Sequence, residues 1–380
     1  MTTTINNEHK KLNVPNLRFP EFEGEWKEER LADIADLYKG TGISKDQLSV
    51  DGEPCILYGE LYTKYKSETI KKVISKTSID NAKLVRSKAN DVIIPCSGET
   101  AEDIATARCV LKDNILLGGD LNIIRLRGHD GSFISYQLNG KRKYDIAKVA
   151  QGVSVVHLYG EHLKGVKTIN PCLDEQKKIA GLLTLLDERI ATQNKIIDKL
   201  QSLIKGIAQK IVRSNKPNVR LYECVECSSS TQQESEVCEQ GAYPVYGANG
   251  IVGYLDDYNT EGEAVYIIKD GSGVGTVSYV TGKCSATGTL NTLQAKDGYS
   301  LQYLYYLLKV FNFEPYKTGM AIPHIYFKDY GKTKVFCPSY TEQLQYARLL
   351  SAIDSKLSVE KNTLRNLSLQ KQYLLRQMFI

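Results

Sequence analysis

The stretch "HLYGEHLKGVKTINPCLDEQ", from His157 to Gln176, decides how this chain of 380 residues is organised. A second stretch, "HIYFKDYGKTKVFCPSYTEQ", from His324 to Gln343, aligns with it without a gap, 167 residues further on. The two share His, Tyr, Lys, Pro, Glu and Gln at matching places. The match continues at the same offset, where Ala180, Leu182, Leu183, Asp187 and Leu200 correspond to Ala347, Leu349, Leu350, Asp354 and Leu367. A correspondence of this length indicates an internal duplication.

Each stretch leads into a long helical pattern with a heptad repeat. Its residues recur at alternating steps of four and three, which is the spacing of a coiled-coil seam. The seam of the first helix contains Ile179, Leu183, Leu186, Ile190, Gln193, Ile197, Leu200, Ile204, Ile207 and Ile211. The seam of the second contains Tyr346, Leu350, Ile353, Leu357, Glu360, Leu364, Leu367, Lys371, Leu374 and Met378. The pattern predicts two long helices that each bury one stripe.

A helix of about 40 residues is about 60 Å long and cannot bury its seam by itself. We expect the two helices to pair as an antiparallel coiled coil, because a large globular segment separates them. The alternative is that each helix packs on its own globular segment. Gln193 and Glu360 occupy equivalent seam positions, where a polar residue fixes register at a cost in stability. Lys371 interrupts the second seam, and we expect its charged end to reach solvent along its aliphatic stem.

A globular segment of mixed strand and helix character, called a head here, precedes each helix. The predicted fold is α+β, with a pseudo-twofold repeat of head and helix. We divide the chain into an N-terminal segment (1–20), a first head (21–172), a first helix (173–213), a second head (214–338) and a second helix (339–380). The heads share little sequence outside the repeated stretch, which favours related roles with different specificity.

The sequence lacks common signatures of catalysis. It has no phosphate-binding loop of the G-x-x-x-x-G-K-[ST] type, and its acidic residues form no spaced cluster like a nuclease site. His157 and His162 flank Glu161, but the second copy has Asp329 in place of the second histidine. We therefore expect a non-catalytic chain without a metal.

The cysteines and the termini bear on the cellular compartment. Nine cysteines are scattered along the chain, which suits a reducing compartment. Cys224 and Cys227 have C-x-x-C spacing, but only Cys238 lies near, so packing explains them better than zinc. No signal peptide or membrane span is evident, and we expect a cytoplasmic protein without membrane contact.

Charge is distributed in the same way along both heads. Residues 21–103 carry a net charge of −5 and residues 104–172 carry +5. In the second head, residues 214–299 carry −6 and residues 300–340 carry +3. A local basic face suits contact with the phosphates of a nucleic acid, although for any single lysine a solvated position is an equally good explanation.

The candidate DNA-contact residues lie in these basic parts. They are Arg125, Arg127, Lys141, Arg142, Lys143, Lys148, His157, Lys164, Lys167, Lys309, Lys317, His324, Lys328, Lys332 and Lys334. Arg125 and Arg127 alternate on a predicted strand and so share a face, and arginine pairs with guanine through two hydrogen bonds. Because His157 and His324 match across the copies, a shared structural or DNA-backbone role suits them better than base reading.

With these features, the sequence resembles the specificity subunits of type I restriction-modification enzymes. The resemblance rests on "PNLRFPEFEGEW" (residues 15–26), on the repeated end of each head with its "EQ" helix start, and on the C-terminal "LLRQMF". It covers essentially the whole chain. The segment "KPNVRLYECVEC", which opens the second head, fits less well than its counterpart in the first.

The resemblance implies a DNA-recognition role. Each head would be a target-recognition domain for one half of a split, asymmetric double-stranded DNA site, and the helices would hold the heads apart. Two methyltransferase subunits would bind the chain and methylate an adenine in each half-site with S-adenosylmethionine. Two restriction subunits would add translocation and cleavage that depend on ATP and Mg²⁺. No cofactor is implied on this chain.

Some roles stay open at this stage. Sequence readers are expected where the heads differ, for example at 58–65, 97–102 and 246–254. Asp187 and Asp354 would cap, pair with a basic residue or contact the methyltransferase; with the seam residues they are the candidate coiled-coil and partner positions. A stand-alone DNA-binding regulator remains an alternative, and it predicts tight specific binding by the chain alone. A nuclease is a further alternative, and it predicts metal-dependent cleavage.

Overall fold

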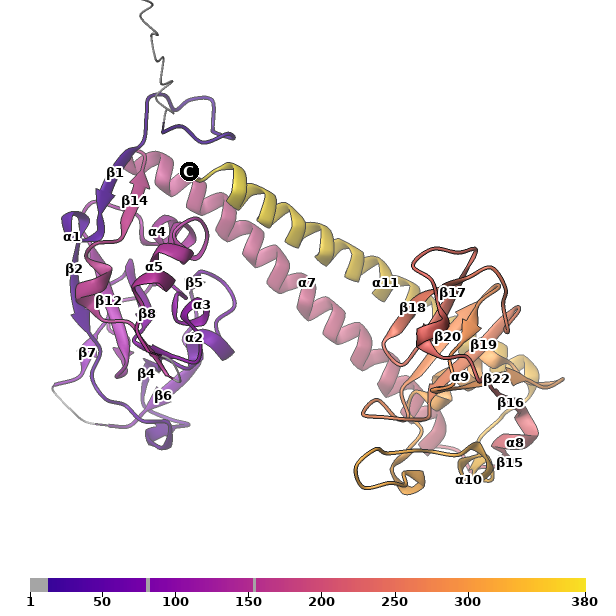
Figure 1. The fold of residues 1–380 in the computed structure, drawn as a ribbon. Coiled ribbons are helices and arrows are strands. Elements are labelled where there is room, and N and C mark those ends of the chain that lie inside the picture. Colours follow the sequence, from indigo (N-terminus) through magenta and orange to yellow (C-terminus); the bar gives the residue numbers. More distant parts are fainter. Residues whose placement is uncertain (1–12, 80–82, 153–154) are drawn as a thin grey trace, which may run out of the picture. The chain divides into compact units, whose positions relative to one another are not determined.

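The computed structural model describes residues 13–79, 83–152 and 155–380, and the chain forms two compact units (Figure 1). The first unit contains Met1–Thr192 and Leu364–Ile380, and the second contains Gln193–Thr363. Part of the predicted N-terminal segment, residues 1–12, lies outside the described residues, as do residues 80–82 and 153–154 of the predicted first head.

Two five-stranded sheets form the frame of the first unit. One has the order β2–β12–β8–β10–β5, antiparallel except between β10 and β5. Its strands are β2 (Ala35–Lys39), β12 (Leu121–Leu126), β8 (Asp91–Pro95), β10 (Arg108–Val110) and β5 (Thr69–Ile70). The other has the order β3–β6–β4–β11–β7, with β4 and β11 parallel. Its strands are β3 (Leu48–Ser49), β6 (Ser75–Thr77), β4 (Glu53–Ile56), β11 (Leu116–Leu117) and β7 (Val85–Arg86).

Shorter elements complete the first head. Two small antiparallel ladders pair β1 (Lys27–Arg30) with β14 (Lys167–Asn170) and β9 (Ser97–Gly98) with β13 (Val156–His157). The helices are α1 (Leu31–Ile34), α2 (Glu60–Thr63), α3 (Ala101–Ile104), α4 (Gly131–Asn139), α5 (Lys143–Val149) and α6 (Gly160–Leu163), with a 3-10 turn η1 at Lys45–Gln47. The β1–β14 ladder joins the beginning of the head to its end.

The core of the first unit lies around β8 and α4. Every residue of β8, the run "DVIIP", is buried, which is why that run carries no polar alternation. Phe133 of α4 packs against Trp26 with ring centroids 5.7 Å apart and against Phe379 with centroids 5.1 Å apart. The N-terminal and C-terminal ends of the unit therefore share one aromatic cluster.

The second unit has smaller sheets. A four-stranded antiparallel sheet contains β16 (Val225–Ser229), β22 (Leu290–Ala295), β19 (Glu263–Ile268) and β20 (Val277–Thr281), in that order. A three-stranded sheet contains β18 (Gly250–Leu255), β17 (Tyr243–Gly247) and β21 (Ser285–Ala286), and β15 (Val219–Arg220) pairs with β23 (Lys334–Val335). The short helices are α8 (Leu221–Cys224), α9 (Leu301–Leu308) and α10 (Phe327–Tyr330), with 3-10 turns η2 (Glu234–Glu236) and η3 (Glu314–Tyr316).

The two heads repeat one framework, which confirms the predicted internal repeat. The ladder β15–β23 corresponds to β1–β14, α8 to α1, and α9 to α4. Asp130 caps α4 by accepting from the third backbone N–H of that helix, and Ser300 caps α9 in the same way. The glutamines of the repeated "EQ" pair reach these caps: Gln176 accepts from the backbone N–H of Asp130 at 3.0 Å, and Gln343 accepts from that of Ser300 at 2.9 Å.

Two long helices, α7 (Leu173–Arg213) and α11 (Tyr340–Gln377), contribute to both units. In each unit a part of α11 lies beside a part of α7, in the antiparallel sense that the seam predicts (Figure 1). All twenty seam residues are buried or half-buried. Gly206 does not interrupt α7. The predicted coiled coil is therefore confirmed, and the alternative also holds in part because the first turns of α7 join the core of the first head.

Candidate nucleic-acid interface

Arg125 lies on β12 and is held by Asp91 at the start of the neighbouring strand β8. Its Nε and Nη2 donate to the two carboxylate oxygens of Asp91 at 2.9 and 2.7 Å, and the Asp91 side chain is 1% exposed. The Tyr38 ring lies 5.0 Å from the guanidinium carbon. This bidentate pair occupies one of the edges through which arginine binds guanine. The DNA-contact role of Arg125 stays a prediction, and any such contact has to use its remaining Nη1 edge.

Arg127 lies one residue beyond β12, so the prediction that both arginines alternate within one strand is wrong. The Arg127 N–H still donates to the carbonyl of Ile34, which continues the register of the β2–β12 pair one residue past the strand. Its Nη1 pairs with Asp36, and its Nη2 donates to the carbonyl oxygens of Ala32 and Asp33 at 3.2 and 3.1 Å. The side chain is nevertheless 48% exposed, so phosphate contact is sterically open.

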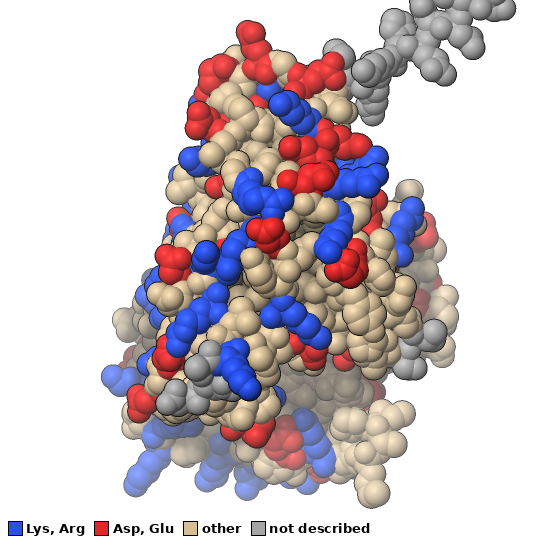
Figure 2. Space-filling model, turned by 90° about the vertical axis from the view of Figure 1, so that its left-hand side faces the viewer, with Lys and Arg blue, Asp and Glu red and all other residues tan. Residues whose placement is uncertain are grey.

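The other basic residues of the first head are partly neutralised by neighbours. Lys164 pairs with Glu161 at 2.7 Å, and Lys167 pairs with Glu28 at 2.7 Å. Lys148 lies 4.5 Å from the centroid of the Tyr144 ring. Figure 2 shows the result on one face of the first unit, where basic and acidic side chains are interspersed.

The cluster at residues 141–143 has a structural component. Arg142 donates to Asp145 at 3.2 Å and to the backbone oxygen of Ile380 at 3.0 Å, so it holds the C-terminal end against the first head. Lys141 is exposed, and Lys143 begins α5 and is half-buried. The two lysines of this cluster are thus better placed for a phosphate than the arginine between them.

In the second head the candidate lysines differ in their surroundings. Lys317 pairs with Glu314 at 2.6 Å, Lys309 donates to the hydroxyl of Tyr305 at 3.1 Å, and Lys328 lies 5.2 Å from the centroid of the Tyr326 ring. Lys332 and Lys334 are exposed, and neither forms an ion pair with a residue that the structure describes.

The matched histidines hold the same backbone position in both heads. His157 and Gln151 exchange both backbone hydrogen bonds, as do His324 and Thr318. The side-chain partner differs, because Nδ1 of His324 lies 2.7 Å from Asp270, whereas Nδ1 of His157 lies 3.5 Å from the hydroxyl of Ser97. The two heads share this backbone pairing and differ in the polar partner of the side chain, and the predicted structural or DNA-backbone role of the two histidines stays a prediction.

The three segments predicted to read sequence are partly regular. Residues 58–65 include α2, residues 97–102 include β9 and the start of α3, and residues 246–254 form much of the β17–β18 hairpin. The hydroxyl of Tyr62 donates to the carbonyl of Ser97 at 3.0 Å, so the first two segments lie together. A pocket of about 850 Å³ borders Tyr58, and one of about 570 Å³ borders Ser97 and His157. None of this tests base contact, which stays a prediction.

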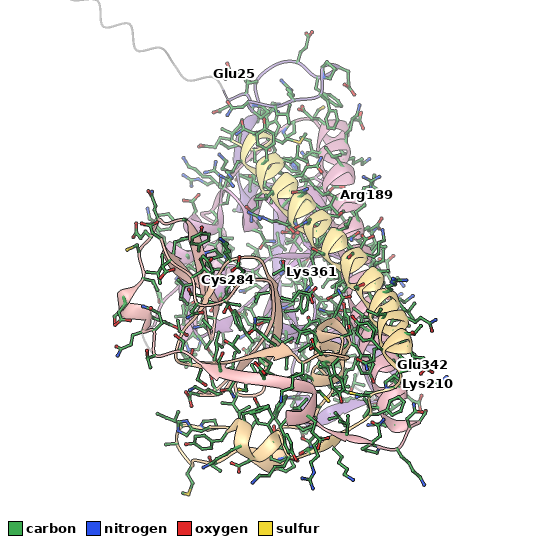
Figure 3. The ribbon with its side chains drawn as sticks, turned by 90° about the vertical axis from the view of Figure 1, so that its right-hand side faces the viewer. Glu25, Arg189, Lys210, Cys284, Glu342 and Lys361 are labelled. Atoms are coloured by element: carbon green, nitrogen blue, oxygen red, sulfur yellow. The ribbon has the colours of Figure 1, made fainter. Side chains whose placement is uncertain are left out.

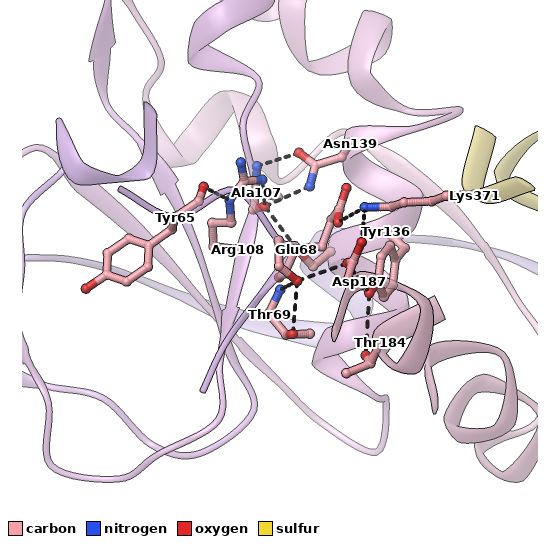
Figure 4. A network of polar contacts seen from close by, with 12 residues as sticks. Tyr65, Glu68, Thr69, Ala107, Arg108, Tyr136, Asn139, Thr184, Asp187 and Lys371 are labelled. Carbon is pink, nitrogen blue, oxygen red and sulfur yellow. Dashed lines mark hydrogen bonds and ion pairs between the residues drawn. The ribbon is translucent and has the colours of Figure 1, made fainter. Parts of the chain in front are cut away.

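Asp187 of α7 is the centre of a buried network in the first unit (Figure 4). It accepts hydrogen bonds from Tyr136 at 2.7 Å and Ser67 at 2.9 Å, and it forms an ion pair with Lys371 of α11 at 2.6 Å. The same ammonium group binds Glu68 at 2.6 Å. Of the roles considered for Asp187, pairing with a basic residue is the one observed.

The expectation that Lys371 reaches solvent is wrong. Its side chain is 15% exposed and points into the first unit, because Glu68 and Asp187 need a buried counter-ion there. Burial raises the pKa of Glu68 above its usual range, Lys371 acts to lower it, and Asp187 adds to the increase. Burial also lowers the pKa of the nearby Arg108. No sequence motif marks Glu68, which lies 303 residues from its partner.

The second unit repeats only part of this arrangement. Asp354 accepts from the hydroxyl of Tyr306 at 3.3 Å, as Asp187 accepts from Tyr136. Ile204 is the residue equivalent to Lys371 at the offset of 167. A pocket of about 390 Å³ lies beside Asp354, and its lining includes Ile204 and Tyr306.

The polar pair of the seam lies in the second unit. Gln193 donates through Nε2 to the backbone oxygen of Glu360 at 3.0 Å and also to its carboxylate. Glu360 pairs in addition with Lys356, one turn earlier. Lys210 of α7 and Lys361 of α11 are exposed off the seam (Figure 3). A partner contact at such off-seam positions stays a prediction.

The described residues offer little sign of cysteine or metal chemistry. Cys224 lies with its sulfur 3.8 Å from that of Cys337, whereas Cys227 donates to the carbonyl of its neighbour Ser228. Within residues 13–79, 83–152 and 155–380, no group of three or more His, Cys, Asp or Glu side chains is arranged to hold a metal ion. In the same ranges, no helix is both long enough and apolar enough to span a membrane.

The family model named "Type I restriction modification DNA specificity domain" matches this chain twice, over residues 23–202 and 218–368. The chain belongs to this family. Each match contains one head and residues of the long helix that follows it. The predicted family is therefore confirmed.

Curated relatives agree with this assignment. The chain is 27% identical over 245 residues to a type I restriction enzyme specificity subunit of Methanocaldococcus jannaschii, covering 59% of this chain and 54% of the relative. It is 27% identical over 117 residues to the EcoprrI specificity subunit of Escherichia coli, covering 31% of this chain and 29% of the relative. A putative type I specificity subunit of Mycoplasma genitalium is 25% identical, with 68% and 73% covered. The matches thus span about a third to a half of the first two relatives.

Solved structures show the same fold. The S subunit of a type I restriction-modification system from M. genitalium superposes with a TM-score of 0.71 at 20% identity, covering 97% of this chain and 99% of that one. A chain from a study of assembly and conformational transition of the type I restriction-modification system gives 0.51 at 15% identity, with 93% and 97% covered. At these identities the likeness concerns the fold.

Proposed function

We propose that this chain is the subunit that gives a type I restriction-modification enzyme its DNA sequence specificity, with each head reading one half of a bipartite double-stranded site. The observation that carries this proposal is the double family match, over residues 23–202 and 218–368. Two copies of a specificity domain on one chain suit a site with two separate parts. The heads have different sheets on a shared framework, so the two half-sites should differ in sequence.

The proposal includes partners. Two methyltransferase subunits would bind the chain and methylate one adenine in each half-site with S-adenosylmethionine, and two restriction subunits would add ATP- and Mg²⁺-dependent translocation and cleavage. The chain itself would catalyse no reaction, hold no cofactor and work in the cytoplasm. The names of the relatives from M. jannaschii and E. coli support this, because both are specificity subunits of type I restriction enzymes.

The decisive experiment compares genome-wide adenine methylation in cells that express the partner subunits with and without this chain. We expect one split, asymmetric motif to lose methylation when the chain is absent. Unchanged methylation would refute the proposal. Specific binding by the purified chain alone, undiminished without the methyltransferase, would favour a stand-alone regulator, and metal-dependent cleavage by the chain alone would favour a nuclease.

An exchange of heads tests the modular part of the proposal. Replacing residues 217–338 with the corresponding head of another family member should change one half of the methylated motif and leave the other half intact. The partner subunits serve as their own control, since they are the same in both strains. A change in both halves would contradict independent reading by the two heads.

A further inference from the structure

A loop in the second head, residues 318–324, exposes apolar side chains at its tip. Met320 is fully exposed and Ile322 is 60% exposed. Ala321 between them is exposed as well. These side chains contribute nothing to the core of the unit, and exposed apolar groups at one tip mark a contact surface more often than a scattered single residue does.

The loop is closed at its base. Thr318 and His324 exchange both backbone hydrogen bonds, at 2.9 and 2.7 Å. Gly319 has φ +88°, and a Cβ at this position would lie 2.3 Å from the carbonyl oxygen of Ile322. Only glycine fits this backbone without displacement. The base of the loop is therefore held in one conformation.

A second set of contacts fixes the loop to the sheet. The N–H of Gly271 donates to the carbonyl of Pro323 at 3.0 Å, and Nδ1 of His324 lies 2.7 Å from Oδ1 of Asp270. These partners lie just beyond the end of β19, a strand of the four-stranded sheet of the head. A loop that is ordered before contact loses little conformational entropy on binding.

The base of this loop is repeated in the first head. Gln151 and His157 exchange both backbone hydrogen bonds, and Gly152 has φ +122° with the carbonyl of Val155 2.1 Å from an added Cβ. Val155 is also exposed, at 53%. The closed base thus belongs to the framework that both heads share, so it is expected to serve a task that both heads have.

Cationic and aromatic residues lie close in sequence to the loop or to the residues that hold its base, and one of them, Lys317, pairs with Glu314. Lys317 immediately precedes the loop, Lys269 adjoins Asp270, and Lys328 lies over the ring of Tyr326, which is 48% exposed. A DNA groove has the complementary features. Phosphates line its edges, and apolar base surfaces, such as thymine methyl groups, lie on its floor. Apolar wedges flanked by basic residues are a known way to contact bases.

We propose that the 318–324 loop enters a groove of the half-site read by the second head and packs Met320 and Ile322 against its bases, with Lys317 and Lys328 on the flanking phosphates. This inference rests on the proposed function and adds the reading element. His324 and Asp270 are positioning residues, because they hold the loop and do not themselves touch a base.

The test uses the full chain assembled with its methyltransferase subunits. The probes are a duplex carrying the motif found by the methylation comparison and a duplex without it. We expect the double variant Met320→Ser/Ile322→Ser to bind the motif roughly tenfold or more weakly, because loss of base contacts at one position typically has this effect. Binding to the other duplex should not change, since phosphate contacts remain.

A matched control and a second variant sharpen the test. Val50→Ser removes an exposed apolar side chain of the first head, 89% exposed just beyond β3, and should leave both affinities unchanged. Gly319→Ala keeps Met320 and Ile322 but opens the base of the loop, and it should reproduce the loss for the motif. Thermal unfolding of all variants verifies that the second unit is folded.

The possible outcomes separate this inference from the proposed function. Wild-type affinity of the double variant for the motif, or an equal loss for both duplexes, would overturn base contact by the loop. Loss of methyltransferase binding in the absence of DNA would show that the tip contacts protein, and would overturn it as well. If the wild-type complex methylates no motif at all, the proposed function itself fails.

Discussion

In each unit, a junction joins the head to the long helices. The two junctions share a framework but differ in the side chains that fill them. In the first unit, the aspartate of α7 is surrounded by a tyrosine hydroxyl, a serine hydroxyl and a lysine ammonium group (Figure 4). In the second unit, the matching aspartate of α11 retains the tyrosine contact and borders a pocket of about 390 Å³. Both copies thus have the helix–head contact, but one junction is a closed ionic site and the other is open.

The difference has a simple origin. Lys371 corresponds to Ile204, so the seam supplies a cation to one junction and an apolar side chain to the other. The segment at Ser67 and Glu68, which covers the first junction, belongs to a sheet arrangement that the second head lacks. A buried carboxylate requires a counter-ion, whereas a carboxylate beside an open pocket is hydrated. The first junction should therefore be the more sensitive to single substitutions.

The largest effect is expected for Lys371→Ile, which gives the first junction the residue of the second. Glu68 and Asp187 would remain buried without a cation, and we expect the free energy of unfolding of the first unit to fall by about 3–5 kcal/mol. Trp26, the one tryptophan of the chain, lies in the core of this unit, so its fluorescence during denaturant unfolding reports on the first unit. Arg365→Ile, at an exposed position of the same helix within the first unit, is the control. Equal free energies of unfolding for the two variants would contradict the greater sensitivity of the first junction.

A smaller and more direct contrast is expected between Asp187→Asn and Asp354→Asn. The first change weakens an ion pair and two hydrogen bonds in a buried site and should cost about 2–3 kcal/mol. The second affects one hydrogen bond of 3.3 Å and should cost under about 1 kcal/mol. Tryptophan fluorescence follows the first unit, and calorimetry follows the second. A cost for Asp354→Asn as large as that for Asp187→Asn would show that the open junction is as constrained as the closed one.

The smallest effect is a dependence on pH that only the first junction should show. Burial raises the pKa of Glu68 from 4.5, so the folded state binds this proton more tightly than the unfolded chain does. The corresponding stability is fully present below the unfolded pKa and is lost as the pH rises through the folded pKa. As the pH rises above the unfolded pKa of the Glu68 carboxyl, the stability of the wild type relative to Glu68→Gln should therefore fall. Tryptophan-monitored unfolding at several pH values measures this difference, and a constant difference would refute the assignment.

Local patterns of the sequence predicted much of the architecture. The heptad spacing of the seams is a local property. The predicted seams are confirmed, because burial along a helix follows the helical period. The polar pair Gln193 and Glu360 was recognisable from the repeat, since the equivalent positions at the pseudo-twofold axis of an antiparallel duplication meet each other. The strands formed by "DVIIP" and "AVYIIK" were evident from their continuous apolar runs.

The candidate site was less predictable, because basic residues were judged without their partners. Arg125 and Arg127 look free in the sequence, yet Asp91 lies 34 residues and Asp36 lies 91 residues away from them along the chain. Lys371 was predicted to reach solvent for the same reason. The signal that could have found the 318–324 loop was "TGMAIPH" itself, in which a glycine and a proline bracket three apolar residues.

The sequence by itself determined the duplication, the two long helices with their seams, and the family, because each of these is written in local periodicity or in residues matched at one fixed offset. Only the tertiary structure decided which charged residues are neutralised, which junction is closed, and which apolar residues are left exposed at the tip of a loop with a fixed base. The physical reason is that ion pairing and burial depend on distances between residues far apart in the chain, such as the 303 residues that separate Glu68 from Lys371. No local pattern carries that information.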